Sequence, residues 1–289
     1  MIKRKNIVWL ASYPKSGNTW YRVFLTNLLT ACSSTADINQ LKSTPIASSR
    51  QLFDDLSGIP SSELTADEID HLRPKVYEEL ARMSPDLQYL KIHDAFTFSK
   101  SGDPLIPLNV TRAVIYIIRN PLDIAVSFAY HSACSIDKMI QLMNNANHMF
   151  CHTPDKLHHQ LRQQLLTWSD HVCSWVDRPA LPLLIIRYED MHLNALDTFK
   201  KSIRFIGLNY TDEQIMRAIE LSAFEHLREQ EEKNGFIEKT SKAERFFRKG
   251  KHGSWKDELT GAQVQTIIRN HHSIMRRFGY LDKNDQPVF

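Results

Sequence analysis

Residues 7–11, Ile-Val-Trp-Leu-Ala, are apolar throughout, with no polar residue in alternation. Such a run predicts a strand buried on both faces, as in parallel sheets that helices cover on both sides. The polar loop "YPKSGNTW" follows at residues 13–20, and apolar side chains then recur at four-residue steps from Trp20 to Leu28. That spacing predicts a helix over residues 19–29. The chain therefore opens with a predicted strand, loop and helix.

Similar signals recur along the rest of the chain. Apolar runs predict further strands at residues 87–93, 113–118 and 183–187. Capping boxes, in which Glu or Gln stands three residues after a threonine, predict helix starts at Thr65, Thr211 and Thr260. A further helix is expected after Asn120, which can cap it, with Pro121 at its first position.

Strands that alternate with helices predict an α/β fold with a central parallel sheet flanked by helices. The sequence shows no internal repeat and no linker, so we expect a single domain over residues 1–289. The ligand site of such a fold lies at the carboxyl ends of the strands.

Several segments give weaker signals. Pro74 is expected to end the first capped helix, with a second helix restarting after it. Apolar residues at helical spacing predict one long amphipathic helix over residues 157–175. Residues 31–60 and 239–260 are polar without a period and predict irregular structure, and residues 135–153 are interpreted as an insertion.

Composition excludes several classes of protein. A content of 42% hydrophobic and 24% charged residues is that of a globular protein rather than a disordered or fibrous one. The net charge of +3 is too small to indicate nucleic acid as a partner. The four cysteines form no Cys-x-x-Cys pair and the histidines show no metal-ligand spacing, so we expect reduced thiols and no metal. Because the cysteines fit reduced thiols, we expect a cytoplasmic location. No apolar stretch approaches the roughly 20 residues of a membrane helix, so we expect no membrane span.

The first loop has the groups that hold an anion. Ser16, Gly17, Asn18 and Thr19 can direct backbone N–H groups and hydroxyls at an oxyanion on the helix start, and Lys15 adds a positive charge. A nucleoside-triphosphate P-loop has its lysine after the last glycine, whereas Lys15 precedes Gly17. The order of residues therefore argues against a kinase P-loop.

Two more segments can bind anions at the same sheet edge. One is Arg119 at a strand end, with Ser127 two turns along the following helix. The other is a basic run, Arg248, Lys249, Gly250 and Lys251. Each has an ordinary structural explanation by itself, but the three segments together indicate a site for phosphate groups.

These motifs resemble those of the cytosolic-type sulfotransferases that use 3′-phosphoadenosine 5′-phosphosulfate (PAPS). Residues 13–20 fit the family's 5′-phosphosulfate loop, Y-P-K-[SA]-G-[TN]-T-W, at every position. Residues 119–131 are similar to its 3′-phosphate motif, and residues 248–256 match R-K-G-x-x-G-x-W-K. The resemblance implies a P-loop nucleotide-kinase-like sulfotransferase fold. It also implies metal-independent transfer of a sulfuryl group from PAPS to a small-molecule hydroxyl, with release of adenosine 3′,5′-bisphosphate (PAP).

The resemblance implies roles for individual residues. His93, in "LKIH", would be the general base, Lys15 would stabilise the leaving phosphate, and Lys91 would hold the sulfuryl oxygens. The implied donor-binding set joins the 5′-phosphate loop, the 3′-phosphate residues and an adenine pocket: Lys15, Ser16, Gly17, Asn18, Thr19, Trp20, Arg119, Ser127, Tyr188, Ser222, Phe224, Phe247, Arg248, Lys249 and Gly250.

The acceptor has weaker signals. Its walls are expected from the variable residues 31–60, 96–107, 132–154 and 229–243, with His131 and His152 at the border. Seven side chains favour an apolar or aromatic acceptor, with ordinary packing as the alternative: Phe96, Phe98, Met139, Met143, Met149, Phe150 and Phe236. A family dimerisation pattern is half present at Lys256 and Thr260, so a monomer or weak homodimer is expected. A P-loop kinase and a non-catalytic nucleotide-binding protein are the rival interpretations.

Overall fold

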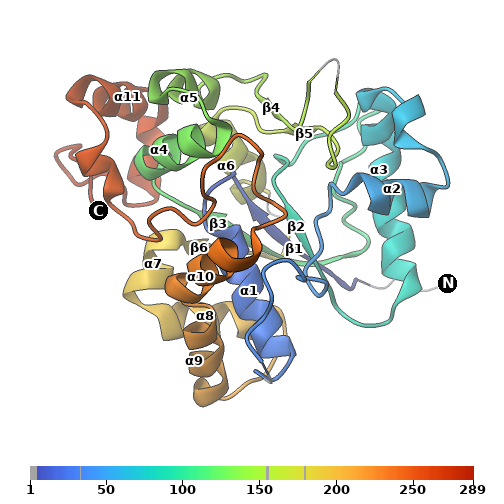
Figure 1. Ribbon diagram of the computed structural model, residues 1–289. Coiled ribbons are helices and arrows are strands. Elements are labelled where there is room, and N and C mark those ends of the chain that lie inside the picture. The colour runs from blue at the N-terminus through green and yellow to red at the C-terminus, as the bar shows by residue number, and fades with distance from the viewer. Residues whose placement is uncertain (1–4, 33, 154–155, 179) are drawn as a thin grey trace.

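A parallel four-stranded sheet forms the centre of the computed structural model, which describes residues 5–32, 34–153, 156–178 and 180–289 (Figure 1). Its strands, in the spatial order β2-β1-β3-β6, are β1 (Ile7–Ser12), β2 (Gln88–Ile92), β3 (Thr111–Ile118) and β6 (Leu183–Arg187). Both central strands are buried almost throughout, as their continuous apolar runs predict. Each predicted strand is confirmed to within a few residues.

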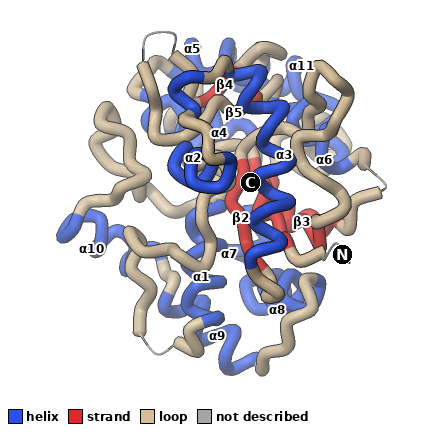
Figure 2. Tube along the Cα trace, turned by 90° about the vertical axis from the view of Figure 1, so that its right-hand side faces the viewer, coloured by secondary structure: helices blue, strands red, loops and turns tan. Residues whose placement is uncertain are grey.

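Helices cover both faces of the sheet (Figures 1 and 2). One face packs against α1 (Asn18–Leu29), α7 (Tyr188–Leu193), α8 (Ala195–Phe205) and α9 (Asp212–Leu221). The other packs against α3 (Ala66–Met83), α4 (Pro121–Ser132), α6 (Trp168–Val176) and α11 (Gly261–Arg277). This is the single-domain α/β fold that the sequence predicts. No helix in the described part of the chain is both long and apolar enough to cross a membrane.

The remaining elements lie around this core. They are α2 (Arg50–Ser57), α5 (Ile136–Met143), α10 (Phe224–Asn234), the 3-10 turns η1 (Ser61–Glu63) and η2 (Ser254–Asp257), and an antiparallel pair, β4 (Met149–Phe150) and β5 (Gln163–Gln164). The prediction that residues 31–60 are irregular is therefore wrong in part, because Ser49 caps α2 by accepting a hydrogen bond from the Leu52 N–H. Residues 135–153 likewise contain α5 and β4.

Pro74 does not end its helix, which corrects the sequence prediction. α3 runs without interruption from Ala66 to Met83 with Pro74 inside it. The neighbouring Arg73 is fully buried and holds both carboxylate oxygens of Asp94, at 2.9 and 2.7 Å. One turn on, the Tyr77 hydroxyl donates to the Ala47 carbonyl. Because these contacts fix the helix on either side of Pro74, the loss of one helical hydrogen bond does not break it.

The long helix predicted over residues 157–175 is also wrong in its first half. α6 begins only at Trp168, where the Thr167 side chain accepts a hydrogen bond from the Asp170 N–H. The chain before it is extended, and the backbone N–H groups of Leu161 and Leu165 donate to other segments rather than to a helical turn. Both leucines are buried, so their helical spacing reflects packing and not a helix.

Candidate active site

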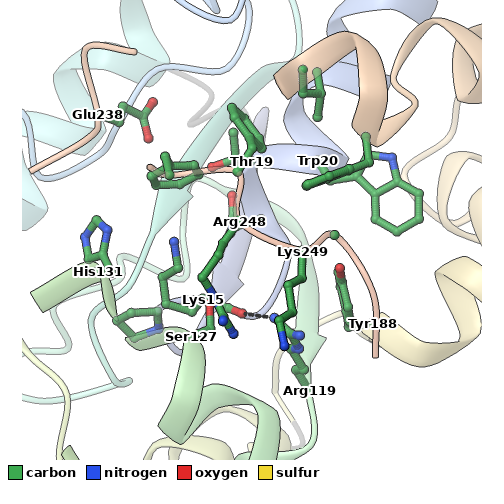
Figure 3. A pocket seen from close by; sticks show the side chains of 18 of the residues that line it. Lys15, Thr19, Trp20, Arg119, Ser127, His131, Tyr188, Glu238, Arg248 and Lys249 are labelled. Carbon is green, nitrogen blue, oxygen red and sulfur yellow. Dashed lines mark hydrogen bonds between the residues drawn. The ribbon is translucent and has the colours of Figure 1, made fainter. Parts of the chain in front are cut away.

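The four parallel strands end at one cavity of about 390 Å³, shown in Figure 3. His93, Arg119 and Tyr188 each follow directly on β2, β3 and β6, and each lines the cavity. The loop after β1 contributes Lys15. The cavity therefore lies where a parallel sheet places its ligands, at the carboxyl ends of the strands.

Most of the predicted site residues line this cavity: Lys15, Gly17, Asn18, Thr19, Trp20, Lys91, His93, Arg119, Ser127, Tyr188, Phe224, Phe247, Arg248, Lys249 and Gly250. Ser16 and Ser222 do not. Ser16 is buried within the loop, and its hydroxyl has no hydrogen-bond partner among the described residues. Ser222 is fully buried after α9, and its hydroxyl donates to the Ile219 carbonyl at 2.9 Å. The hydroxyl of Ser222 is thus used within its own helix end.

The first loop has a backbone shape that requires glycine. Gly17 caps α1 with a φ of 99°, and a Cβ there would lie 2.5 Å from the Tyr188 ring. The Asn18 side chain donates to the Leu10 carbonyl at 2.8 Å and to the Ser12 hydroxyl at 3.1 Å. Because both bonds hold the loop to β1, Asn18 offers an anion its backbone N–H rather than its amide group.

Lys15 points into the cavity without a carboxylate partner among the described residues. Its Nζ lies 3.8 Å from the centre of the Phe246 ring. Burial, together with the nearby Arg119 and Lys91, lowers the pKa of Lys15 to about 7. An anion at this place would favour the charged lysine, so the amine is prepared for a negatively charged ligand.

Arg119 joins the first loop to the loop at residues 246–255, which contains the basic run and is called the C-terminal loop below. Its guanidinium donates to the Lys15 carbonyl at 3.0 Å and to the Lys251 carbonyl at 3.1 Å. It stacks 4.2 Å above the Tyr188 ring. Its Nε is buried and finds no acceptor within the described residues, so Arg119 keeps a free donor.

The C-terminal loop is fixed by acidic residues that the sequence did not identify. Asp123 on α4 accepts hydrogen bonds from the Gly253 N–H at 2.7 Å, the Ser254 hydroxyl at 3.1 Å and the Trp255 N–H at 3.1 Å. Glu231 on α10 accepts from the backbone N–H groups of Phe246 and Phe247, at 2.6 and 2.8 Å. These acids lie far along the chain from their partners, so no local pattern could reveal them.

The basic residues of this loop are positioned by pairing and by close packing. Arg248 binds both carboxylate oxygens of Glu258, and Lys249 lies 2.6 Å from one of them. Burial raises the pKa of Glu258, but Arg248 and Lys249 outweigh it, and the net pKa is lowered. Gly250 has a φ of 61°, and a Cβ there would lie 2.0 Å from the Phe224 ring. Only glycine fits this approach.

His93 is held in the orientation that a base needs. Its Nδ1 lies 2.8 Å from the Ser12 carbonyl, which can only accept, so the proton is on Nδ1 and Nε2 carries a lone pair. His171 lies 3.0 Å from the His93 carbonyl and is itself bonded to the Tyr116 hydroxyl at 2.8 Å. Burial, and then the charge of Lys91, lowers the pKa of His93 well below 6.5. The imidazole is therefore neutral near pH 7.

Lys91 is part of a buried ionic cluster that the sequence did not predict. Its Nζ lies 2.7 Å from Glu238, whose other oxygen lies 2.6 Å from the Arg22 guanidinium. Burial raises the pKa of Glu238, but Lys91 and Arg22 outweigh it and the net pKa is lowered. Glu238 comes from the variable residues 229–243, so this segment is tied to Lys91 on β2.

The predicted acceptor side chains are only partly brought together. Phe150 lines the cavity, joined by Cys151, Gln160 and Thr240. Among the other predicted residues, Met139, Met143 and Phe96 pack in the core, Phe236 packs against Phe246 and Phe247, and Phe98 is exposed. Ordinary packing is thus the correct interpretation for most of them. His131 lines the cavity, whereas His152 is exposed on the surface. Ser33 and Pro154, within two predicted acceptor segments, lie outside the described residues.

Comparisons with known proteins extend over nearly the whole chain. A family model described as "Sulfotransferase domain" matches residues 5–279. Mouse sulfotransferase 2A6 is 26% identical over 271 residues, which cover 92% of this chain and 83% of the relative. The structure of mouse sulfotransferase SULT7A1 complexed with PAP matches with a TM-score of 0.60 at 22% identity, covering 94% of this chain and 85% of that one. Retinol dehydratase in complex with androsterone and PAP matches with a TM-score of 0.63 at 19% identity, covering 97% and 84%. Both structures share the fold described above.

Proposed function

Because this chain belongs to the sulfotransferase family, we propose that it moves the sulfuryl group of PAPS to the hydroxyl group of a small-molecule acceptor. The products are a sulfate ester and PAP. One observation carries the proposal: a single cavity is lined by two cationic groups, Lys15 with the first loop and Arg119 with Arg248, and by the neutral His93, whose Nε2 carries the lone pair. A PAPS-dependent sulfotransferase needs all three in one place.

The two cationic groups of residues suit a nucleotide with phosphates at two positions. The N-terminus of α1 with Lys15 suits the 5′-phosphosulfate, because backbone N–H groups and an ammonium that pairs with no carboxylate among the described residues converge there. Arg119, Ser127 and Arg248 suit the 3′-phosphate, since Arg119 keeps a buried free donor among the described residues. The rings of Trp20 and Tyr188, 5.9 Å apart at the cavity wall, would hold the adenine.

The chemistry follows from the positions of three side chains. His93 Nε2 takes the proton of the acceptor hydroxyl while that oxygen forms a bond to sulfur in line with the departing phosphate oxygen. As the sulfur–oxygen bond to the phosphate breaks, Lys15 stabilises the negative charge that collects on the leaving oxygen. Lys91 holds the sulfuryl oxygens through its buried ammonium group. These groups complete the transfer without a metal ion in the proposed mechanism.

The acceptor is proposed to be a small molecule with an apolar body. Phe150 and Phe246 add aromatic rings to the cavity wall beside His131. A structural neighbour of this chain, retinol dehydratase, is seen in complex with androsterone, a ligand of this general type. Apolar walls with a few polar groups are typical of sites for such ligands.

Transfer of label from sulfur-labelled PAPS to a panel of alcohols and phenols tests the proposal. Wild-type protein should give a labelled ester and PAP in equal amounts. His93→Ala should lower kcat by roughly 10² to 10⁴ and leave the affinity for PAP unchanged, since a general base contributes about that much. Lys15→Ala should lower kcat and weaken PAP binding together. Full activity in either variant would overturn its assigned role.

A further inference from the structure

His131 is a polar side chain buried in an aromatic part of the cavity wall. It lies on the last turn of α4, four residues after Ser127, so both side chains project from the same side of the helix (Figure 3). The rings of Phe128, Phe150 and Phe246 lie around it at 6.3, 6.3 and 5.7 Å between centroids. Only 6% of the residue is exposed.

The His131 ring lacks a partner that its burial would require. Its Nδ1 is buried and has no hydrogen bond to any residue that the structure describes. The backbone carbonyl of His131 accepts a hydrogen bond from the Thr240 hydroxyl at 2.8 Å, a contact that leaves the ring itself without an orienting bond at Nδ1 among the described residues. A buried ring nitrogen without a partner costs free energy, so native proteins normally satisfy it. A ligand in the cavity can supply the partner.

The hydrogen bonding of the His131 ring differs from that of His93, the proposed base. The His93 ring is fixed by its bond to the Ser12 carbonyl, whereas the His131 ring has no such orienting bond at Nδ1. Burial, with Lys15 and Lys91 nearby, lowers the pKa of His131 to about 2, so the ring stays neutral. A neutral imidazole has one donor and one acceptor, and it can bind either a carbonyl or a hydroxyl oxygen.

The position of His131 also separates it from the donor. Figure 3 shows it beside Lys15, on the side away from Arg119 and Tyr188, which belong to the proposed nucleotide site. The negative charge of Glu238 would favour a protonated His131 imidazole, but this carboxylate is already paired with Lys91 and Arg22. The ring therefore faces the part of the cavity that is left for the acceptor.

We propose that His131 determines acceptor specificity by hydrogen bonding to a second neutral oxygen, a hydroxyl or a carbonyl, on an aromatic acceptor. This oxygen is distinct from the hydroxyl that is sulfated at His93. The inference rests on the proposed function, because it assigns the acceptor to the same cavity. The preferred acceptor class is thus an apolar ring system with two neutral oxygens rather than one.

Acceptor binding to the PAP-loaded protein tests this inference without depending on turnover. The probes are 2-naphthol derivatives that carry a hydroxyl, an acetyl or a methyl group at matched positions on the second ring, titrated by calorimetry. For at least one position, the wild-type protein should bind the hydroxyl or acetyl compound about tenfold more tightly than the methyl compound, the worth of one buried hydrogen bond. His131→Phe should reduce this preference to less than about twofold and should bind 2-naphthol itself normally.

Two further variants make the result specific. His131→Gln keeps a donor and an acceptor and should retain part of the preference. His148→Phe is a matched control, because His148 packs on the same Phe128 ring at 6.0 Å but bonds to the Tyr13 hydroxyl and is not among the cavity-lining residues described. It should keep the full preference. Thermal unfolding and PAP affinity verify that each variant is folded.

The absence of any preference in the wild-type protein, or its persistence in His131→Phe, would overturn the inference. Sulfate transfer to the same probes reports separately on the proposed function. A preference in binding without transfer by the wild-type protein would overturn the proposed function, and His131 would then be a ligand-binding residue rather than one that selects an acceptor.

Discussion

Lys15 should make the affinity for PAP depend on pH. In the free protein its pKa is lowered to about 7 by burial and by the nearby Arg119 and Lys91. A bound phosphate favours the charged lysine and raises this pKa, so binding above pH 7 requires the uptake of a proton. The affinity should therefore fall as pH rises above 7, by up to about tenfold per pH unit, until the pKa of the complex is reached.

Calorimetry in two buffers of different ionisation enthalpy measures this proton uptake directly. Lys15→Met should bind PAP weakly and with no comparable dependence on pH over the same range. A wild-type affinity that stays constant as pH rises above 7 would contradict the combination of a lowered Lys15 pKa and a contact between Lys15 and the bound phosphate.

At the scale of single residues, the sequence identified the cations of the site better than the anions. Lys15, Arg119 and Arg248 stand in motifs with fixed local spacing, so the sequence could predict that they share one site, and all three line the cavity. Glu238 stands in no such motif, and Asp123 lies within residues 119–131 without a role that the motif assigns to it. They act through contacts with residues distant in sequence, Lys91 and the 253–255 backbone, and only the folded chain shows these contacts.

At the scale of elements, α4 should position the C-terminal loop through Asp123. The Asp123 carboxylate accepts hydrogen bonds from three donors in residues 253–255. Asp123→Asn leaves one acceptor oxygen for these donors, and its new amide N–H group points at a donor that then has no acceptor. We expect a loss of about 1–3 kcal/mol in the free energy of unfolding, the cost of buried groups left without partners. We also expect PAP affinity to fall about tenfold or more. A loss of about 1.4 kcal/mol in binding free energy, caused by a poorly positioned loop, is enough for that change.

The control for this variant lies on a neighbouring helix. Asp137 on α5 is exposed and accepts a bond from Gln263, so Asp137→Asn should change stability by less than about 0.5 kcal/mol. Urea unfolding and PAP titration measure both quantities. An Asp123→Asn protein that is destabilised but binds PAP normally would contradict the positioning role.

The elements differ in how well the sequence predicted them. The difference depends on whether local apolar spacing or contacts with distant segments decide the backbone conformation. The strands β1 and β3 are buried on both faces, so their apolar runs were a sufficient signal. Pro74 predicted a break that does not occur, because Arg73 and Tyr77, on either side of it in α3, bond to Asp94 and Ala47 outside the helix. The apolar spacing before Trp168 predicted a helix that does not form, because that backbone bonds to Ser48 and His148.

At the scale of the whole molecule, four strands and the C-terminal loop are needed to build one site. The sequence predicted that the three cationic segments would meet at the carboxyl ends of the strands, because parallel sheets gather them there. The acceptor side could not be predicted in the same way. It is formed by segments without regular pattern, and three of the seven apolar residues proposed for it, Phe96, Met139 and Met143, pack in the core instead.

The most direct test of the account compares nucleotides by their effect on thermal unfolding. The site is built for phosphates at both the 5′ and 3′ positions, so PAP should stabilise the protein by about 2.7 kcal/mol at a hundredfold excess over its Kd. AMP, which lacks the 3′-phosphate, should stabilise it less at the same concentration, and the difference should shrink in Arg119→Met. Stabilisation by ATP with Mg²⁺ but not by PAP would contradict the account and would indicate a kinase site.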